Sequence, residues 1–367
     1  MTQHNYYVDQ DIRKAYTLPS ELYTTADWHI FFKNHLFRNS WQWTGGKEIW
    51  NNEVCVFPFY FCEGSLDEPL ILTRNNNEIK CFSNVCTHRA NIIVQEPSTR
   101  ARFSCRYHGR CFDLQGKMCG MPEFEEVTGF PSLNDDLTRY QVQKAFGFFF
   151  TALWPSHNFE DVFAPVWDYC RNFPFDDLEF QPEFSRDYHV KANWMTYCDN
   201  YSEGFHIPFV HPSLSKAITY DEYTVKTFEH CTLQIGYCKP GEKSIPLQKN
   251  DPDFGQEVYA YYFFVYPNLM INFYHWGISV NVVEPTSSES TRIKFRTYLR
   301  KGFSKEALED TALHITEMED EQIVENVQHG LRSSSYSRGR FSPSREQGVH
   351  AFHLYISRLI ESTRSQL

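Results

Sequence analysis

The alternation of hydrophobic and polar residues changes character twice along the chain. Residues 25–36 begin with threonine and an acidic first turn, a pattern that predicts a helix. From residue 41 to about 153, short β-branched and aromatic runs are separated by Gly, Asn, Asp and Pro, which predicts a small antiparallel β domain. Its expected strands are residues 53–62, 69–74, 78–84, 101–105 and 141–154.

The C-terminal half mixes long strands with helices. A Pro- and Asp-rich stretch, about residues 155–182, is expected to connect the two halves. Residues 193–205 favour a helix that ends near Pro208. Four long hydrophobic runs predict strands of one large antiparallel sheet: residues 231–238, 258–267, 269–285 and 291–299. The predicted fold class is α+β.

Helical spacing returns near the C-terminus. Residues 305–331 and about 347–364 have the 3.6-residue period of helices, and Gly330 is a natural stop for the first of them. We expect the apolar residues of this helix to lie on one stripe: Leu308, Leu313, Ile315, Met318, Ile323, Val324 and Val327.

The bulk composition is that of a folded chain with two domains. Its 367 residues are 41% hydrophobic, and no apolar run approaches the ~18 residues of a membrane span. The N-terminus lacks the basic and apolar regions of a secretory signal, so we expect a cytoplasmic protein with no membrane contact. A net charge of −11 argues against a nucleic-acid partner.

The eleven cysteines are odd in number and thinly spread, which disfavours a disulfide scaffold. Two of them have ligand spacing, because Cys86-Thr-His88 is followed after sixteen residues by Cys105-Arg-Tyr-His108. Two thiolates on one iron and two imidazoles on the other make a Rieske-type [2Fe–2S] centre, an electron carrier of raised potential. A Cys2His2 zinc site is the alternative, but zinc favours Cys–Cys and His–His pairs over mixed ones.

A second group of ligand-type residues follows in the C-terminal half. Glu203, His206 and His211 have the spacing Glu-x2-His-x4-His. Two histidines with one carboxylate hold an iron and leave positions open for oxygen and substrate. A pair of ordinary satisfied histidines would also fit this spacing, but the upstream cluster motif favours the metal interpretation.

These motifs resemble the Rieske non-haem iron oxygenases. The likeness is carried by CTH and CRYH followed by Gly109, by NWMTYCDNYSEGFHIPFVHP, and by MEDEQIVENVQHGL, and it spans about residues 41–356. Within the family, YPNLMINFYHW and the C-terminal tail are most similar to choline monooxygenase and related quaternary-ammonium (betaine and carnitine) oxygenases.

The resemblance implies an N-terminal segment (1–40) packed on the catalytic domain, a Rieske domain (41–153) and a catalytic domain (154–367) with a helix-grip, START-like sheet. It implies that the cluster ligands are Cys86, His88, Cys105 and His108. It also implies that a mononuclear Fe(II) is held by His206, His211 and Asp320, with Glu319 and Glu321 as fallback carboxylates.

By the same resemblance, Glu203 is the catalytic acid that links the iron site to a cluster histidine of a neighbouring subunit in a homotrimer. Most members have aspartate there, so bridging, coordination and hydrogen bonding to a ligand all stay open. Asp199 is the runner-up, with a structural role favoured. Arg106 and Arg110 depart from the family's proline and tryptophan, which suggests a donor with acidic groups.

The implied activity is a monooxygenase or demethylase that uses O2 and two electrons from a separate NAD(P)H-dependent flavin/iron–sulfur reductase. The expected substrate is a small quaternary ammonium compound, which aromatic faces bind well. The candidate pocket residues are Tyr201, Phe205, Tyr274 and Trp276. Two alternatives stay open: aromatic-ring dihydroxylation, and an electron carrier without oxygenase chemistry.

Overall fold

The computed structural model describes residues 6–50, 53–309 and 313–364. The described chain forms two compact units, a small unit of residues 37–156 and a large unit made by the rest. The boundaries lie within a few residues of the expected 40/41 and 153/154. The segment before residue 37 belongs to the large unit.

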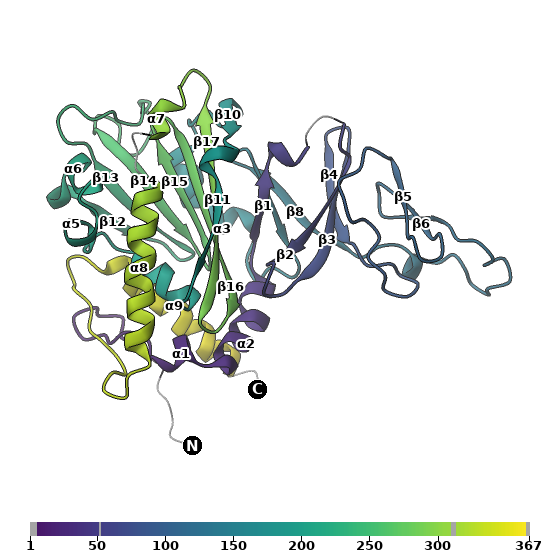
Figure 1. The fold of residues 1–367 in the computed structure, drawn as a ribbon, viewed down its shortest axis with the longest axis horizontal. Helices are drawn as coiled ribbons and strands as arrows, with labels where there is room; N and C mark the ends of the chain where they lie inside the picture. The colour runs from purple at the N-terminus through teal and green to yellow at the C-terminus, as the bar shows by residue number, and fades with distance from the viewer. Residues whose placement is uncertain (1–5, 51–52, 310–312, 365–367) are drawn as a thin grey trace. The chain divides into compact units, whose positions relative to one another are not determined.

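The small unit consists of two antiparallel sheets (Figure 1). Six strands have the order β1-β9-β8-β4-β3-β2: β1 (Gln42–Gly46), β9 (Phe148–Ala152), β8 (Arg139–Ala145), β4 (Glu78–Ser83), β3 (Glu68–Asn75) and β2 (Val56–Phe61). Three short strands form the second sheet: β5 (Arg102–Ser104), β6 (Cys111–Asp113) and β7 (Met118–Gly120).

The run expected as one strand over residues 141–154 is a hairpin, β8 and β9. Its turn is Phe146 and Gly147, with φ of +54° and +77°. Positive φ at both central residues is characteristic of a two-residue hairpin turn whose twist matches that of the flanking strands. The small antiparallel β domain is confirmed, with this split and with β1, β6 and β7 added.

The large unit is built on one antiparallel sheet of eight strands. Its strand order is β10-β17-β16-β15-β14-β13-β12, with β11 also paired to β17. The strands are β10 (Leu178–Phe180), β11 (Arg186–Val190), β12 (Thr224–Thr227), β13 (Cys231–Tyr237), β14 (Val258–Val265), β15 (Leu269–Tyr274), β16 (Gly277–Ser287) and β17 (Ser290–Arg300). The run expected as one strand over residues 269–285 is therefore two, β15 and β16, which turn at His275 and Trp276.

The helices of the large unit pack on both faces of this sheet. They are α1 (Glu21–Thr24), α2 (Ala26–His35), α3 (Phe159–Cys170), α4 (Trp194–Tyr201), α5 (Ile207–Val210), α6 (Leu214–Ala217), α7 (Glu306–Glu309), α8 (Leu313–Leu331) and α9 (Gln347–Arg364). The prediction of a connecting segment at residues 155–182 is corrected, because much of this segment forms helix α3, which contains Pro165.

Alternation along β14 separates the two faces. Tyr261 and Phe263 contact Tyr169 of α3 on one face. Phe264 contacts Phe352 of α9 on the other. Helices α4 and α9 lie on this second face, and α8 packs against α4, α1 and β11 (Figure 1). Since neighbouring strand residues point to opposite faces, the even-numbered residues of β14 face the layer that contains α4 and α9.

The expected apolar stripe is wrong for four of its seven residues, while Leu308 and Val324 are buried as expected. Ile315, Met318, Ile323 and Val327 are exposed, whereas the buried residues of the helix are Glu317, Val324 and Gln328. Gln328 Oε1 accepts a hydrogen bond of 2.9 Å from the backbone N–H of Asn193, at the start of α4. The inward face of this helix therefore combines Val324 with two polar residues, and four of its apolar residues are exposed.

Candidate metal sites and cavity

Two loops of the small unit, residues 86–91 and 105–110, carry the cysteine and histidine motifs. In each, the cysteine N–H donates to the carbonyl five residues on, and the N–H four residues on donates back to the cysteine carbonyl, at 2.8–2.9 Å. The residue at that fourth position has a positive φ in both loops, +55° at Ala90 and +76° at Gly109. The loops are equivalent turns, and each presents one thiol and one imidazole.

The four side chains of these loops are grouped by type. The rings of His88 and His108 lie 4.8 Å apart, centroid to centroid. Cys86 and Cys105 are buried neighbours, and the Asn91 amide donates to Cys105 Sγ at 3.4 Å. Burial opposes ionisation of Cys105, but N–H donors outweigh it and lower the pKa of this thiol. Thiol beside thiol and imidazole beside imidazole is the division that fits a Rieske cluster.

The two arginines near the second loop have different environments. Arg106 is exposed, but Arg110 is buried, 3.2 Å from Asp135 Oδ1 and 2.8 Å from Thr87 Oγ1. The Arg110 guanidinium also lies over the ring of Phe130. The expectation that both arginines face an electron donor is therefore corrected for Arg110, which forms a buried ion pair with Asp135 inside the small unit.

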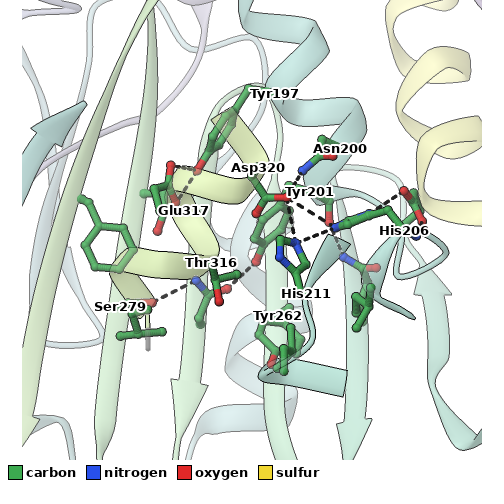
Figure 2. A pocket seen from close by; sticks show the side chains of 18 of the residues that line it. Tyr197, Asn200, Tyr201, His206, His211, Tyr262, Ser279, Thr316, Glu317 and Asp320 are labelled. Carbon is green, nitrogen blue, oxygen red and sulfur yellow. Dashed lines mark hydrogen bonds and ion pairs between the residues drawn. The ribbon is translucent and has the colours of Figure 1, made fainter. Parts of the chain in front are cut away.

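In the large unit, His206, His211 and Asp320 come together as a group that fits one metal ion. Their ligand atoms all lie within 4.8 Å of one another. His211 Nε2 is 3.1 Å from His206 Nε2 and 2.9 Å from Asp320 Oδ1 (Figure 2). Asn200 donates to the same Asp320 oxygen at 2.6 Å. Two imidazoles and one carboxylate converging from one side are the donor set of a mononuclear non-haem iron site.

The outer nitrogen of each histidine contacts a carboxylate. His206 Nδ1 lies 2.6 Å from Glu203 Oε1, and His211 Nδ1 lies 2.8 Å from Glu319 Oε2. Such contacts keep the proton on Nδ1 and direct the Nε2 lone pair toward the metal position. Burial opposes protonation of His211, but Asp320 and Glu319 raise its pKa. Within the chain, Glu203 therefore hydrogen-bonds a ligand rather than joining the trio.

Local sequence explains how the histidines meet. Asn193 caps α4, since its side chain accepts a hydrogen bond of 2.9 Å from the Met195 N–H. The single turn of α5 then has His206 at its N-cap and His211 at its C-cap, with Pro208 in the first turn. This turn brings both rings to Asp320, since Asp320 Oδ1 lies 2.9 Å from His211 Nε2 and 3.5 Å from His206 Nε2.

The trio opens onto a cavity of about 110 Å³ between helices α4 and α8 and the inner face of the sheet. Six of its lining residues are tyrosines: Tyr197, Tyr201, Tyr223, Tyr259, Tyr262 and Tyr274. Most lining residues of the strands alternate, as the period of two requires: Gln234, Tyr262, Asn272, Tyr274, Ser279, Asn281 and Phe295. Tyr259 departs from this alternation, because β13 and β14 shift register beside it. An apolar cavity of about 150 Å³ takes up a benzene, so this space suits a small molecule.

A buried carboxylate lines the cavity beside the trio. Glu317 is 5% exposed, and it accepts a hydrogen bond from Tyr197 Oη at 2.6 Å (Figure 2). It accepts a second one from Asn281 Nδ2 at 3.3 Å. Burial raises the pKa of Glu317 to about 8. Asn281 Oδ1 is buried and has no hydrogen-bond partner in the described chain.

The predicted pocket aromatics divide into two pairs. Tyr201 and Tyr274 line the cavity. Phe205 and Trp276 do not, and the prediction is corrected for both. Phe205 is 42% exposed, while Trp276 is buried behind Tyr274, with the two rings stacked at 4.7 Å. Trp276 comes from the β15–β16 turn, which the single-strand prediction did not include.

Other predicted carboxylates lie outside the trio. Asp199 accepts a hydrogen bond from Tyr23 Oη at 2.8 Å and lies 2.9 Å from His353 Nε2, in agreement with its favoured structural role. Glu319 contacts His211 from outside, and Glu321 does not line the cavity. The sequence prediction missed Glu317 and Asn281. Glu317 could have been found, because its three-residue spacing from Asp320 places these two carboxylates on one face of the helix.

Two family models match the chain. The model of the ring-hydroxylating alpha subunit (catalytic domain) matches residues 175–362, and the model of the Rieske [2Fe-2S] domain matches residues 62–131. The first covers about half of the chain and includes the whole metal trio. The second includes both cysteine–histidine motifs.

Similar proteins match over nearly the whole chain. A chloroplastic choline monooxygenase from Beta vulgaris is 27% identical, over 95% of this chain and 78% of its own length. The carnitine monooxygenase oxygenase subunit of Escherichia coli (strain K12) is also 27% identical, over 95% of both chains.

Solved structures share the fold. A quaternary ammonium Rieske monooxygenase studied for carnitine oxidation by gut microbiota has a TM-score of 0.80 at 22% identity, over 95% of this chain and 96% of its own. Naphthalene 1,2-dioxygenase from Rhodococcus sp. has a TM-score of 0.76 at 16% identity, over 94% of both chains. The predicted α+β architecture, with a small β domain and a large-sheet domain, is confirmed.

No helix in the described part of the chain combines the length and apolar character needed to span a membrane.

Proposed function

The chain belongs to the ring-hydroxylating alpha-subunit family, with a Rieske domain ahead of the catalytic domain, and we propose that it is the oxygenase that oxidises a small quaternary ammonium compound. It is an oxidoreductase whose cofactors are a Rieske [2Fe–2S] cluster and a mononuclear non-haem iron, with O2 as cosubstrate. The substrate class and the residue assignments are proposals.

The proposed ligands follow from the donor sets. Cys86, His88, Cys105 and His108 hold the cluster, and His206, His211 and Asp320 hold the iron. Bound together, these groups supply two electrons and activate O2 for insertion into a substrate C–H bond. The alternative of an electron carrier is disfavoured because a carrier has no need of a complete second ligand set facing a cavity.

The observation that carries the substrate class is the lining of six tyrosines around a small cavity at the trio. A trimethylammonium group offers no hydrogen-bond donor, and aromatic faces attract it through their negative quadrupole. Both relatives named above are called oxygenases of such compounds, choline and carnitine. A two-ring arene is a poorer match to a cavity of about 110 Å³ with several polar lining groups.

The chain's own side chains then have defined tasks. Glu203 and Glu319 hold the Nδ1 protons of His206 and His211, and this orients both rings. The tyrosines and the α4–α8 layer exclude water and place one C–H bond of the substrate near the open side of the trio.

An alpha subunit of this family works with a separate reductase, and we propose the type of reductase and the oligomeric state. Electrons come from a separate reductase, for which we propose an NAD(P)H-dependent flavin/iron–sulfur protein. We propose a homotrimer in which Glu203 faces a cluster histidine of the neighbouring subunit; the solved quaternary ammonium relative is described in terms of inter-subunit electron transfer. Light scattering tests the trimer, and cell fractionation tests the expected cytoplasmic location.

Oxygen uptake tests the function. We expect the chain with a reductase to consume O2 with at least one of choline, carnitine, glycine betaine and proline betaine, and formaldehyde release separates N-demethylation from hydroxylation at another carbon. Uptake with naphthalene alone would favour arene dihydroxylation instead. His206→Ala should retain the visible spectrum of the cluster and lose uptake, and unchanged uptake in that variant would refute the oxygenase assignment.

A further inference from the structure

The cavity lining contains acidic side chains but, among its described residues, no lysine or arginine. It includes three carboxylates, Glu203, Glu317 and Asp320. Glu203 is held by His206, and Asp320 is held by His211 and Asn200. Glu317 is thus the carboxylate of the lining that is not committed to a histidine.

The position of Glu317 suits contact with a bound molecule. It precedes Asp320 by three residues on α8, so the two side chains reach the cavity from one face (Figure 2). Residues at this spacing on a helix have Cβ atoms roughly 5–6 Å apart. Its partners are donors only, the Tyr197 hydroxyl and the Asn281 amide. A buried carboxylate with neutral donors and no cation is costly, unless a cation binds beside it.

Asn281, next to Glu317, has a buried acceptor atom without a hydrogen-bond partner in the described chain. The acceptor is Oδ1, whereas the amide nitrogen donates to Tyr197 Oη at 2.9 Å and to Glu317. A buried acceptor left unpaired costs about 1–3 kcal/mol. A hydroxyl group on a bound molecule would satisfy it.

We propose that Glu317 recognises the positive charge of the substrate and Asn281 its hydroxyl group, so that the substrate is a quaternary ammonium alcohol that carries no carboxylate. This inference rests on the proposed function and narrows it. Choline has this chemistry, whereas carnitine and glycine betaine add a carboxylate.

Exclusion of carboxylated compounds follows from the same lining. A substrate carboxylate in this cavity would lose its water without gaining an arginine or lysine, and it would lie near the acidic side chain of Glu317. Such burial of an unpaired anion is strongly unfavourable. The cavity therefore discriminates against substrate carboxylates in two ways: Glu317 repels them, and the lining offers no lysine or arginine to pair with them. Attraction of the substrate cation to Glu317 adds to this selectivity.

Binding and turnover of matched compounds test the inference. Anaerobic calorimetry measures affinity without reaction, and oxygen uptake with a reductase gives kcat/KM. The probes are choline, its uncharged isostere 3,3-dimethyl-1-butanol, carnitine and γ-butyrobetaine. We expect wild type to prefer choline over both carboxylated compounds by a hundredfold or more in Kd and in kcat/KM.

The variant Glu317→Gln keeps the shape and one acceptor oxygen for Tyr197 but removes the charge. It should lose tenfold or more in choline affinity and leave binding of the uncharged isostere within about twofold. Glu321→Gln removes an acid one turn further along α8, outside the cavity lining, and should leave choline affinity unchanged. Asn281→Ala should weaken choline binding more than binding of tetramethylammonium, which has no hydroxyl.

The outcomes separate this inference from the proposed function. Oxygen uptake with none of the quaternary ammonium compounds would refute the function itself. Equal or better turnover of carnitine or γ-butyrobetaine would leave the function intact and overturn the assignment of the substrate class. Unchanged choline affinity in a folded Glu317→Gln protein would overturn the role of Glu317.

Discussion

The contact between Glu319 and His211 yields a quantitative prediction. Glu319 Oε2 lies 2.8 Å from His211 Nδ1, and its side chain is 32% exposed. A hydrogen bond to a charged partner contributes about 1.5–3 kcal/mol, and partial exposure to solvent favours the lower end of that range. About 1.4 kcal/mol corresponds to a tenfold change in a binding constant. We therefore expect Glu319→Gln to weaken Fe(II) binding about tenfold and Glu319→Ala to weaken it more.

The assay is reconstitution of iron-depleted protein with Fe(II) under anaerobic conditions. The iron concentration that restores half-maximal oxygen uptake is measured, together with iron retained after gel filtration. The visible spectrum of the cluster, which belongs to the other unit, reports that the protein is intact.

Glu325→Gln is the matched control for Glu319, because Glu325 lies on the same helix but accepts a hydrogen bond from the Lys191 N–H at 2.9 Å. It should not change iron binding. If Glu319→Gln and Glu319→Ala both bind Fe(II) within about twofold of wild type, the argument that this carboxylate orients His211 is refuted.

Three further predictions follow from other parts of the structure. Gly277→Ala should destabilise the large unit by about 2 kcal/mol or more in urea unfolding, because an added Cβ would lie 2.0 Å from the Tyr298 carbonyl oxygen; an unchanged midpoint would contradict this packing. Arg110→Ala should lower the stability of the small unit by about 3 kcal/mol through its buried ion pair with Asp135, whereas exposed Arg106→Glu should leave stability unchanged and slow cluster reduction by the donor. Burial raises the pKa of Glu317 to about 8, so this carboxyl is protonated at lower pH; kcat/KM for choline should rise as the pH approaches 8, and this rise should be absent in Glu317→Gln.

The sequence was most informative where ligand spacing is local. The Cys-x-His and Cys-x2-His motifs and the pair His206 and His211 are each contained in one loop or one turn, so spacing predicted what the fold brings together. Asp320 lies more than a hundred residues from His211, among Glu317, Glu319 and Glu321. Only the resemblance singled it out, and the structure brings it to the two histidines.

The missed features depend on which face of an element turns inward. Hydrophobic periodicity put the apolar residues of α8 inside, but the helix turns Glu317 and Gln328 inward and exposes Met318. Polar residues at a cavity reverse the usual pattern, so a rule based on apolar burial fails where a site is built. Trp276 was misplaced for a related reason, because the turn after β15 directs it behind Tyr274.

Helix α8 carries Glu317, Asp320 and Gln328. Gln328 accepts a hydrogen bond from the Asn193 N–H, which ties this helix to the start of α4. Residues three apart on a helix keep a fixed backbone spacing, because the hydrogen bonds of the helix hold it. The backbone distance between the cavity carboxylate and the carboxylate of the metal trio is therefore set within one element, and a substitution that displaces α8 would shift both together.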